Sequence, residues 1–273
     1  MLKVITILKE IFSHLSLIWT VARYNNKAEL QSHYFGFVWE FLNPVIEISL
    51  NWFVFSAIRN RQPLYFGEYE VPFLAWMLIG MSAWRLMNRA TLSASQSIQK
   101  KIKLVSKMQF PVSTLPAMEI AGKTSAYFVT LGIVIIILLF NGITPTIYWF
   151  QSIYYMFAMF IFIYFLALLN STLTITFRDY HQILTPIMRL LFWFSGVVWR
   201  LDEMEVIPNW FVRATDLNPF SYILTGFRNA FLSGEFFWQH WETTVFFWLV
   251  VILLAVTSSH LHLKLRAKFI DLI

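Results

Sequence analysis

Long hydrophobic stretches, separated by short polar segments, dominate the pattern along this chain. Between Thr124 and Phe177 there is no charged residue and no histidine, and "NGITPT" at 141–146 divides that stretch into two. A helix needs roughly 20 mostly apolar residues to cross about 30 Å of hydrocarbon. The pattern therefore predicts an all-α membrane protein with a single transmembrane domain over 1–273. Its six predicted transmembrane helices are 37–58, 71–95, 117–140, 147–174, 183–199 and 241–262.

Composition agrees with a membrane protein and excludes several other classes. Hydrophobic residues make up 58% of the chain and charged residues only 13%, against about 25% charged in soluble domains. Cysteine is absent, which excludes disulfides and thiolate metal sites. His260 and His262 lack a third ligand nearby, so we expect no metal site. The N-terminus has no cleavable signal pattern, and we expect it to be retained.

The basic residues predict the orientation in the membrane. Lysines and arginines gather before the first span, between the second and third, and after the last, which would place those segments in the cytoplasm. Tyr148, Trp149, Trp238 and Trp241 stand where an aromatic belt at the opposite surface is expected. Both termini are therefore predicted to be cytoplasmic.

Residues 1–22 carry polar side chains at helical spacing. Lys3, Thr6, Glu10 and Ser13 fall on one stripe of an otherwise apolar helix. This pattern is typical of a helix that lies in the membrane interface. A simple membrane anchor would show the same pattern.

The longest predicted cytoplasmic connection, "SIQKKIKLVSKMQFPVSTLP" at 97–116, also has two faces. As a helix ended by Pro111, it would separate an apolar side from a lysine side. The apolar side holds Ile98, Ile102, Val105 and Met108, and the basic side holds Lys100, Lys103 and Lys107. Such a helix could dock in a groove of a cytoplasmic partner or rest on anionic lipid headgroups.

The first two spans each contain a polar stripe. The stripe of span one is Glu40, Asn43, Glu47 and Asn51, and that of span two is Arg85, Arg89, Ser93 and Gln96. At 1.5 Å rise per residue, Glu40 matches Arg89 in depth and Glu47 matches Arg85. These groups would form internal ion pairs, or the arginines would bind the phosphate of a lipid substrate. Arg189 in span five is a third arginine for which both roles are possible.

The segment 200–241 is too apolar and aromatic for a solvated loop. Two short amphipathic helices are predicted near 207–214 and 219–232, with Asn218-Pro219 at the start of the second. We favour re-entrant helices at an outer gate over a plain cap.

The octet "AMEIAGKT" at 117–124 fits a loose form of the phosphate-loop pattern. A working phosphate loop joins a buried strand to a helix, whereas this octet continues into a predicted transmembrane helix. We therefore expect no nucleotide site and no ATP hydrolysis in this chain.

Several stretches together resemble the permease subunits of the ABC-2 family that export lipid-linked polymers. They are "FGFVWEFLNPVIEISLNWFVF", "IKLVSKMQFPVSTLP", "FRDYHQIL" and "LNPFSYILTGFRNAFL". The resemblance covers essentially the whole chain. With "NWFVF" at 51–55 and the tail "LHLKLRAKFIDLI" at 261–273, it looks closest to the wall teichoic acid export permeases.

The resemblance implies a homodimer in the bacterial plasma membrane, paired with two copies of a separate ABC ATPase that holds ATP and Mg²⁺. The substrate would be an undecaprenyl-diphosphate-linked anionic polymer; nucleic acid is not expected. Residues 23–36 would gate the lipid-side entrance, and spans one and five would line the passage. Coupling to the ATPase would involve Ile98, Lys100, Lys101, Ile102, Lys103, Val105, Lys107, Met108, Arg178 and Asp179.

Two further sets complete the expected transport machinery. The candidates for the substrate path are Arg23, Lys27, Trp39, Glu40, Asn43, Glu47, Asn51, Arg85, Arg89 and Arg189. The candidates for the outer gate are Asn218, Pro219, Tyr222, Phe227 and Arg228.

Other substrates and activities remain alternatives at this point. O-antigen and capsule permeases share the Trp-Asn-Pro region and the coupling segment, so export of those lipid-linked polysaccharides is one. An ABC-2 drug exporter is another, although the polar stripes favour a charged headgroup. A membrane-embedded transferase is a third, but the acids of "LDEMEVI" at 201–207 resemble a solvated run rather than a catalytic group.

Overall fold

Helices make up nearly all of the regular structure. The computed structural model describes residues 2–31, 34–36, 38–58, 64–66, 69–105, 111–177, 179–199, 208, 212, 215, 217–233 and 235–269. Its main helices are α1 (Leu2–Ser13), α2 (Leu15–Gln31), α3 (Val38–Ile58), α4 (Phe73–Ser95), α5 (Ser97–Val105), α6 (Thr114–Phe140), α7 (Gln151–Thr176), α8 (Tyr180–Phe194), α10 (Pro219–Arg228) and α11 (Trp241–Leu265). Short helical turns precede α7 (η1, Ile147–Phe150) and α11 (η4, Phe237–His240), and follow α10 (η3, Asn229–Ser233) and α11 (η5, Arg266–Lys268).

Each of the six predicted hydrophobic segments is helical over most of its length, but the helices differ in length and polarity. Within the described residues, Thr114–Phe140, Ile147–Thr176 and Phe237–Leu265 are long and apolar enough to span a membrane, and the bent pair of α1 and α2 would add a fourth. The helix α8 has only 15 residues. The helix α4 has 23 residues but carries two arginines, so length and composition do not establish six spans.

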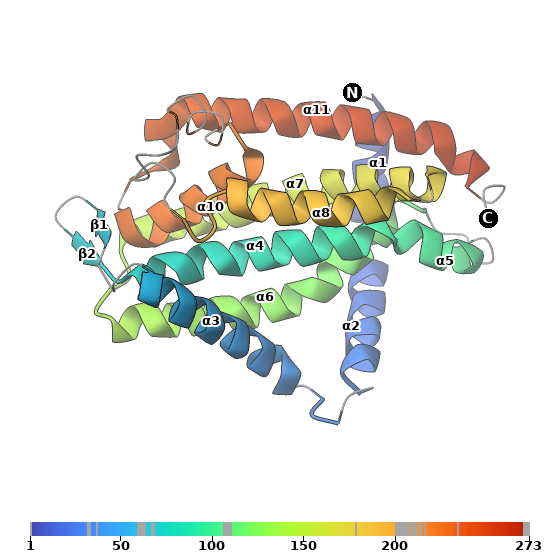
Figure 1. Cartoon of the computed structure of the whole chain (residues 1–273). Coiled ribbons are helices and arrows are strands. Elements are labelled where there is room, and N and C mark those ends of the chain that lie inside the picture. The colour runs from blue at the N-terminus through green and yellow to red at the C-terminus, as the bar shows by residue number, and fades with distance from the viewer. Residues whose placement is uncertain are drawn as a thin grey trace.

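The polarity of α4 has a structural reason. This helix lies at the centre of the bundle and packs against α6, α7, α8 and α10 (Figure 1). Most of its side chains are buried by these neighbours rather than by lipid. A transmembrane helix that is shielded by protein can carry polar groups that a lipid-facing helix could not.

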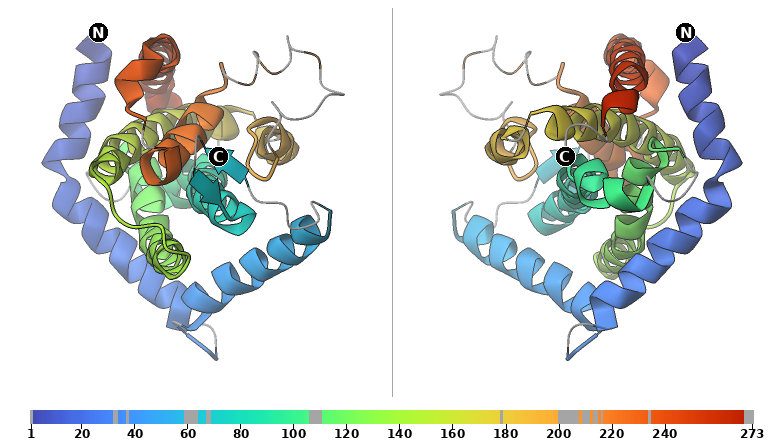
Figure 2. Two further views of the ribbon diagram at one scale, coloured as in Figure 1. Left: turned by 90° about the vertical axis from the view of Figure 1, so that its left-hand side faces the viewer. Right: turned by 90° about the vertical axis from the view of Figure 1, so that its right-hand side faces the viewer.

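The two N-terminal helices lie across the direction of the long helices (Figures 1 and 2). The predicted single helix over 1–22 is instead two helices that meet at a bend of 62°, and their position in the membrane interface stays a prediction. Ser13 Oγ and His14 Nδ1 both bond to the carbonyl of Glu10. Such local bonds compete with helix continuation and explain the break.

Helix α3 stands away from the bundle and forms a V with α2 when the molecule is viewed end-on (Figure 2). Many of its large apolar side chains, including Leu50 and Phe53, are exposed. Pro44 is the one side chain of α3 that is buried among those the structure describes. The face that α3 leaves open must therefore meet lipid or another protein chain.

One feature of the fold was not predicted, a small hairpin between α3 and α4. Strands β1 (Leu64–Phe66) and β2 (Tyr69–Val71) pair antiparallel, with Leu64 opposite Val71 and Phe66 opposite Tyr69. The sequence does contain the signal, two short runs of aromatic and apolar residues separated by Gly67-Glu68. The hairpin lies at the end of the bundle opposite α5 (Figure 1).

Candidate functional site

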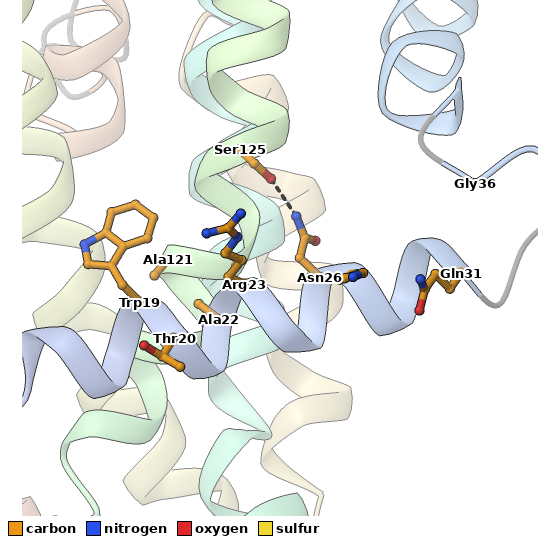
Figure 3. Close-up of a pocket in the computed structure, with 11 residues that line it drawn as sticks. Trp19, Thr20, Ala22, Arg23, Asn26, Gln31, Gly36, Ala121 and Ser125 are labelled. Carbon is orange, nitrogen blue, oxygen red and sulfur yellow. Dashed lines mark hydrogen bonds between the residues drawn. The ribbon is translucent and has the colours of Figure 1, made fainter.

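A large cavity lies between α2 and α6. It has a volume of about 710 Å³ and is lined by Trp19, Thr20, Ala22, Arg23, Asn26, Lys27, Gln31, Gly36, Ala121, Gly122 and Ser125. Small residues on both helices, Ala22, Ala121 and Gly122, let the two backbones approach closely. Asn26 Nδ2 donates to Ser125 Oγ at 2.7 Å and ties the helices together (Figure 3).

This cavity contains two of the predicted substrate-path residues, Arg23 and Lys27. Arg23 projects from α2 toward α6 beside Asn26 (Figure 3). The segment that was expected to gate the entrance, 23–36, is therefore helical as far as Gln31 and forms one wall of the cavity. Trp39 packs its ring edge-on against Phe35 at 6.0 Å, near the same wall.

A basic cleft lies on the other side of α6. Its described lining includes Arg85 and Arg89 from α4 and Lys123 from α6, together with Ser82, Leu86, Ala126, Tyr127 and Thr130. Lys123 adjoins Gly122, which lines the large cavity, so the two spaces lie at neighbouring faces of α6. Even with Arg85 paired to Glu47, the basic residues outnumber the acidic ones in the described lining of this cleft, which favours an anion nearby.

The predicted pairing of span one with span two is confirmed at one position. Arg85 Nη2 lies 2.9 Å from Glu47 Oε2. The side chains of Glu40 and Asn51 lie outside the described residues, so the predicted pairing of Glu40 with Arg89 is not seen. Asn43 is exposed on α3. Arg189 is exposed on α8 and is not part of the described lining of the cleft.

Helix α5 forms where the coupling helix was predicted, but its first turn faces inward. Ile98 is fully buried with Ile18, Leu115, Met118, Ile175 and Phe269. Ile98 was expected on the docking face for a partner, and its burial in the chain's own core corrects that expectation. Ile98 is buried because the first turn of α5 covers the junction of α2, α6 and α7. The spacing of apolar residues along α5 alone does not predict this tertiary contact.

The charged side of α5 is also partly engaged within the chain. Lys101 Nζ lies 2.6 Å from Glu119 Oε1, and Ser93 Oγ donates to Glu119 Oε2 at 2.6 Å. Lys100 is exposed, as is Asp179, which precedes α8. The side chains of Ile102, Lys103 and Val105 lie outside the described residues, as do Lys107, Met108 and Arg178 altogether.

Helix α10 starts as its sequence predicts. Asn218 caps it by accepting a hydrogen bond from Phe220 N at 3.0 Å, and Pro219 occupies the first turn. Most of the first predicted outer helix, 207–214, lies outside the described residues. Because α10 packs on α4, α7 and α11, the predicted gate residues Tyr222, Phe227 and Arg228 are buried rather than exposed on an outer surface.

Two functional candidates on α6 were missed from the sequence. Glu119 pairs with Lys101, and Lys123 lines the basic cleft. Both fall in the octet "AMEIAGKT", which lies on a helix as expected. Charged residues inside a long apolar helix indicate a function by themselves. The sequence therefore contained a signal for Glu119 and Lys123 that does not depend on a nucleotide site.

These features define a class of protein. Long apolar helices packed around a buried central helix that carries two arginines describe a multi-pass membrane protein. The family model of the ABC-2 type transporter matches residues 16–232. The chain belongs to this family.

Three relatives cover three quarters of the chain or more. An O-antigen export system permease protein RfbA of Klebsiella pneumoniae is 20% identical over 258 residues, which are 94% of this chain and 95% of that protein. A second from the same organism is 20% identical over 259 residues, again 94% and 95%. The protein of the same name in Myxococcus xanthus is 21% identical over 203 residues, 74% of this chain and 75% of its own length.

Proposed function

We propose that this chain is the permease subunit of an ATP-driven exporter that moves a lipid-linked polysaccharide across the bacterial plasma membrane. The family match and the relatives named as O-antigen export permeases support this function. They favour the O-antigen type of substrate over teichoic acid, which the resemblance of the sequence had suggested first. Two copies of the chain would form the passage, with both termini in the cytoplasm.

The observation that carries the proposal is the position of the basic cleft. Arg89 and Lys123 line this small cleft, of about 30 Å³, beside a 710 Å³ cavity that contains Arg23 and Lys27, and the third cation of the cleft, Arg85, is paired with Glu47. A diphosphate headgroup needs several cationic donors, and guanidinium groups bind phosphate oxygens in pairs. Because the cavity lies against the interface helix α2, a lipid could present its headgroup there while its tail stays in the bilayer.

The route from the ATPase to this cavity would run through α5. Ile98 of α5 packs in the same buried cluster as Ile18 of α2, and the next residue of α2, Trp19, lines the cavity. A movement of α5 imposed by two ATPase subunits would therefore displace one wall of the cavity. Interlocked, close-packed helices transmit such displacements with little loss.

Export of surface polysaccharide in a strain that lacks its own copy of this gene tests the proposal. Arg89→Gln and Lys123→Gln should each lower the amount of surface polymer about tenfold, because a hydrogen bond to a charged group contributes about 1.5–3 kcal/mol. Lys264→Gln is the matched control, since Lys264 is exposed near the end of α11. It should support export at the level of the unmodified chain.

Two outcomes would contradict the substrate path. In the first, the cleft variants export as much polymer as Lys264→Gln while reaching the membrane in equal amount. In the second, the cleft variants fail to accumulate, which would assign these cations to packing. A strain that lacks the gene also identifies the polymer, because the lipid-linked form that accumulates inside will be an O-antigen-type glycan or a teichoic acid.

A further inference from the structure

Glu119 is a carboxylate within a long apolar helix. Helix α6 has 27 residues, and the charged ones among them are Glu119 and Lys123. The side chain of Glu119 is only 21% exposed. A charged group in such a position is costly unless it is paired, so its partners indicate why the helix carries it.

The two carboxylate oxygens of Glu119 are bonded to two other helices. Lys101 Nζ of α5 lies 2.6 Å from Oε1, and Ser93 Oγ of α4 donates to Oε2 at 2.6 Å. Glu119 therefore fastens α5 to the contact between α4 and α6. Of these two partners only Lys101 is charged. A displacement of α5 would remove the cation with which the carboxylate forms its ion pair, and a largely buried charge left in this way is strongly unfavourable.

The basic cleft lies one helical turn from this contact, on both helices. Lys123 follows Glu119 by four residues on α6, and Arg89 precedes Ser93 by four residues on α4. Both cations line the cleft. Four residues advance about 6 Å along a helix axis. Side chains at this spacing share a face, and a glutamate followed by a lysine attract each other.

Glu119 therefore stands between two lysines of different roles. Lys101 belongs to α5, and Lys123 belongs to the cleft. The charge of Lys123 also acts on the Glu119 carboxylate, in addition to that of Lys101. Loss of one lysine should strengthen the attraction to the other, because the carboxylate then has one cation less to neutralise it.

We propose that Glu119 links the position of α5 to the affinity of the basic cleft for an anion. When Lys101 is in place, α5 neutralises the carboxylate, and the charge of Lys123 acts on the cleft. When α5 moves away, the carboxylate attracts Lys123, the positive potential of the cleft falls, and a bound anion is released. Glu119 is thus a positioning residue. This inference rests on the proposed function, under which an ATPase displaces α5 and the anion is a lipid diphosphate.

The test measures the affinity of the full chain for geranyl diphosphate, a short, water-soluble lipid diphosphate. Isothermal titration calorimetry gives the Kd in phosphatidylcholine nanodiscs. Lys101→Met removes the cation of α5 and should weaken binding about fivefold, within the usual range of coupling between two sites. Lys264→Met is the matched control, because Lys264 is exposed near the end of α11. It should bind the diphosphate as the unmodified chain does.

Glu119→Gln keeps the size of the side chain and removes its charge. It should strengthen binding, and it should cancel the effect of Lys101→Met in the double variant. In a Lys123→Gln background, Lys101→Met should change the Kd by less than about twofold, because the cation that Glu119 would attract is already absent. A pair that only fastens helices would give another pattern, in which both variants lower the melting temperature and neither changes the Kd.

Three results would overturn the proposal: Lys101→Met binds as tightly as Lys264→Met, Glu119→Gln weakens binding, or the unmodified chain does not bind the diphosphate saturably. If Lys101→Met does not fold, Glu119→Gln still decides, because it must bind more tightly than the unmodified chain. Export in a strain that lacks the gene tests the proposed function separately. If the Kd values follow the expected pattern but export does not need the gene, the charge link stands and the proposed function fails. If export needs the gene but Lys101→Met leaves the Kd unchanged, the reverse holds.

Discussion

Arg228 illustrates how a single buried cation can organise one end of the bundle. Its guanidinium lies 3.5 Å from the centroid of the Trp76 ring and donates to the carbonyls of Gly196 and Val197 at 2.8 and 2.6 Å. Those carbonyls follow the end of α8, where the helix dipole favours positive charge. Gly80 makes room for it, since a Cβ there would lie 2.2 Å from Nη2.

Gly80→Ala should therefore destabilise the protein by about 1–3 kcal/mol through overpacking. Thermal unfolding of the purified chain, followed by tryptophan fluorescence, measures the effect. Gly132→Ala is the control, because nothing lies within 4 Å of its added Cβ, and it should be neutral or slightly stabilising. In a double-mutant cycle, Arg228→Met should cost less in the Gly80→Ala background than alone. Strict additivity would show that the two residues do not act together.

At the scale of elements, the turn that follows α11 connects α5 to α1 and α2. Phe269 follows η5 and is fully buried with Ile18 and Ile98. Arg266 Nη1, in the same turn, lies 2.9 Å from Glu10 Oε1 of α1. Phe269 thus fills the junction through which α5 contacts α2.

Phe269→Ala should loosen α5 without unfolding the bundle. Removing a buried phenylalanine costs about 3–5 kcal/mol, and here the loss falls on one junction. Hydrogen exchange should increase in 97–105 and remain unchanged in α10, while polysaccharide export declines. Phe128→Ala, in which an exposed phenylalanine of α6 is removed, should change neither. Uniformly faster exchange throughout the bundle would contradict a local role for Phe269.

The sequence predicted the helices well and their contacts poorly. The third predicted span, 117–140, is helical as Thr114–Phe140, because hydrophobic length alone determines such a segment. The depth match of Glu47 and Arg85 also followed from helix geometry. In contrast, three features depend on which helices become neighbours in the fold. They are the burial of Ile98, the cavity between α2 and α6, and the buried position of Arg228. Residue spacing along one helix carries no information about that choice.

At the scale of the whole molecule, α3 is a helix whose apolar side chains the rest of the chain leaves largely exposed. Val45, Ile46 and Leu50 are all exposed on it, and its divergence from the bundle leaves room for a second copy (Figure 2). Because the chain has no cysteine, single cysteines can report this contact. Val45→Cys or Ile46→Cys should form a disulfide-linked dimer in membranes, whereas Phe128→Cys on α6 should not. Equal cross-linking at all three positions would indicate random collision.

A permease of the proposed kind moves its substrate only with energy from a separate ATPase. Reconstitution of the chain with the ABC ATPase of the same cell, in liposomes that hold a lipid-diphosphate-linked glycan, tests this dependence. We expect the glycan to become accessible on the opposite leaflet only when ATP and both proteins are present. We also expect Arg89→Gln to slow this movement although the complex still hydrolyses ATP. Glycan movement by the chain alone, or ATP hydrolysis by the chain purified free of its partner, would contradict the proposed function.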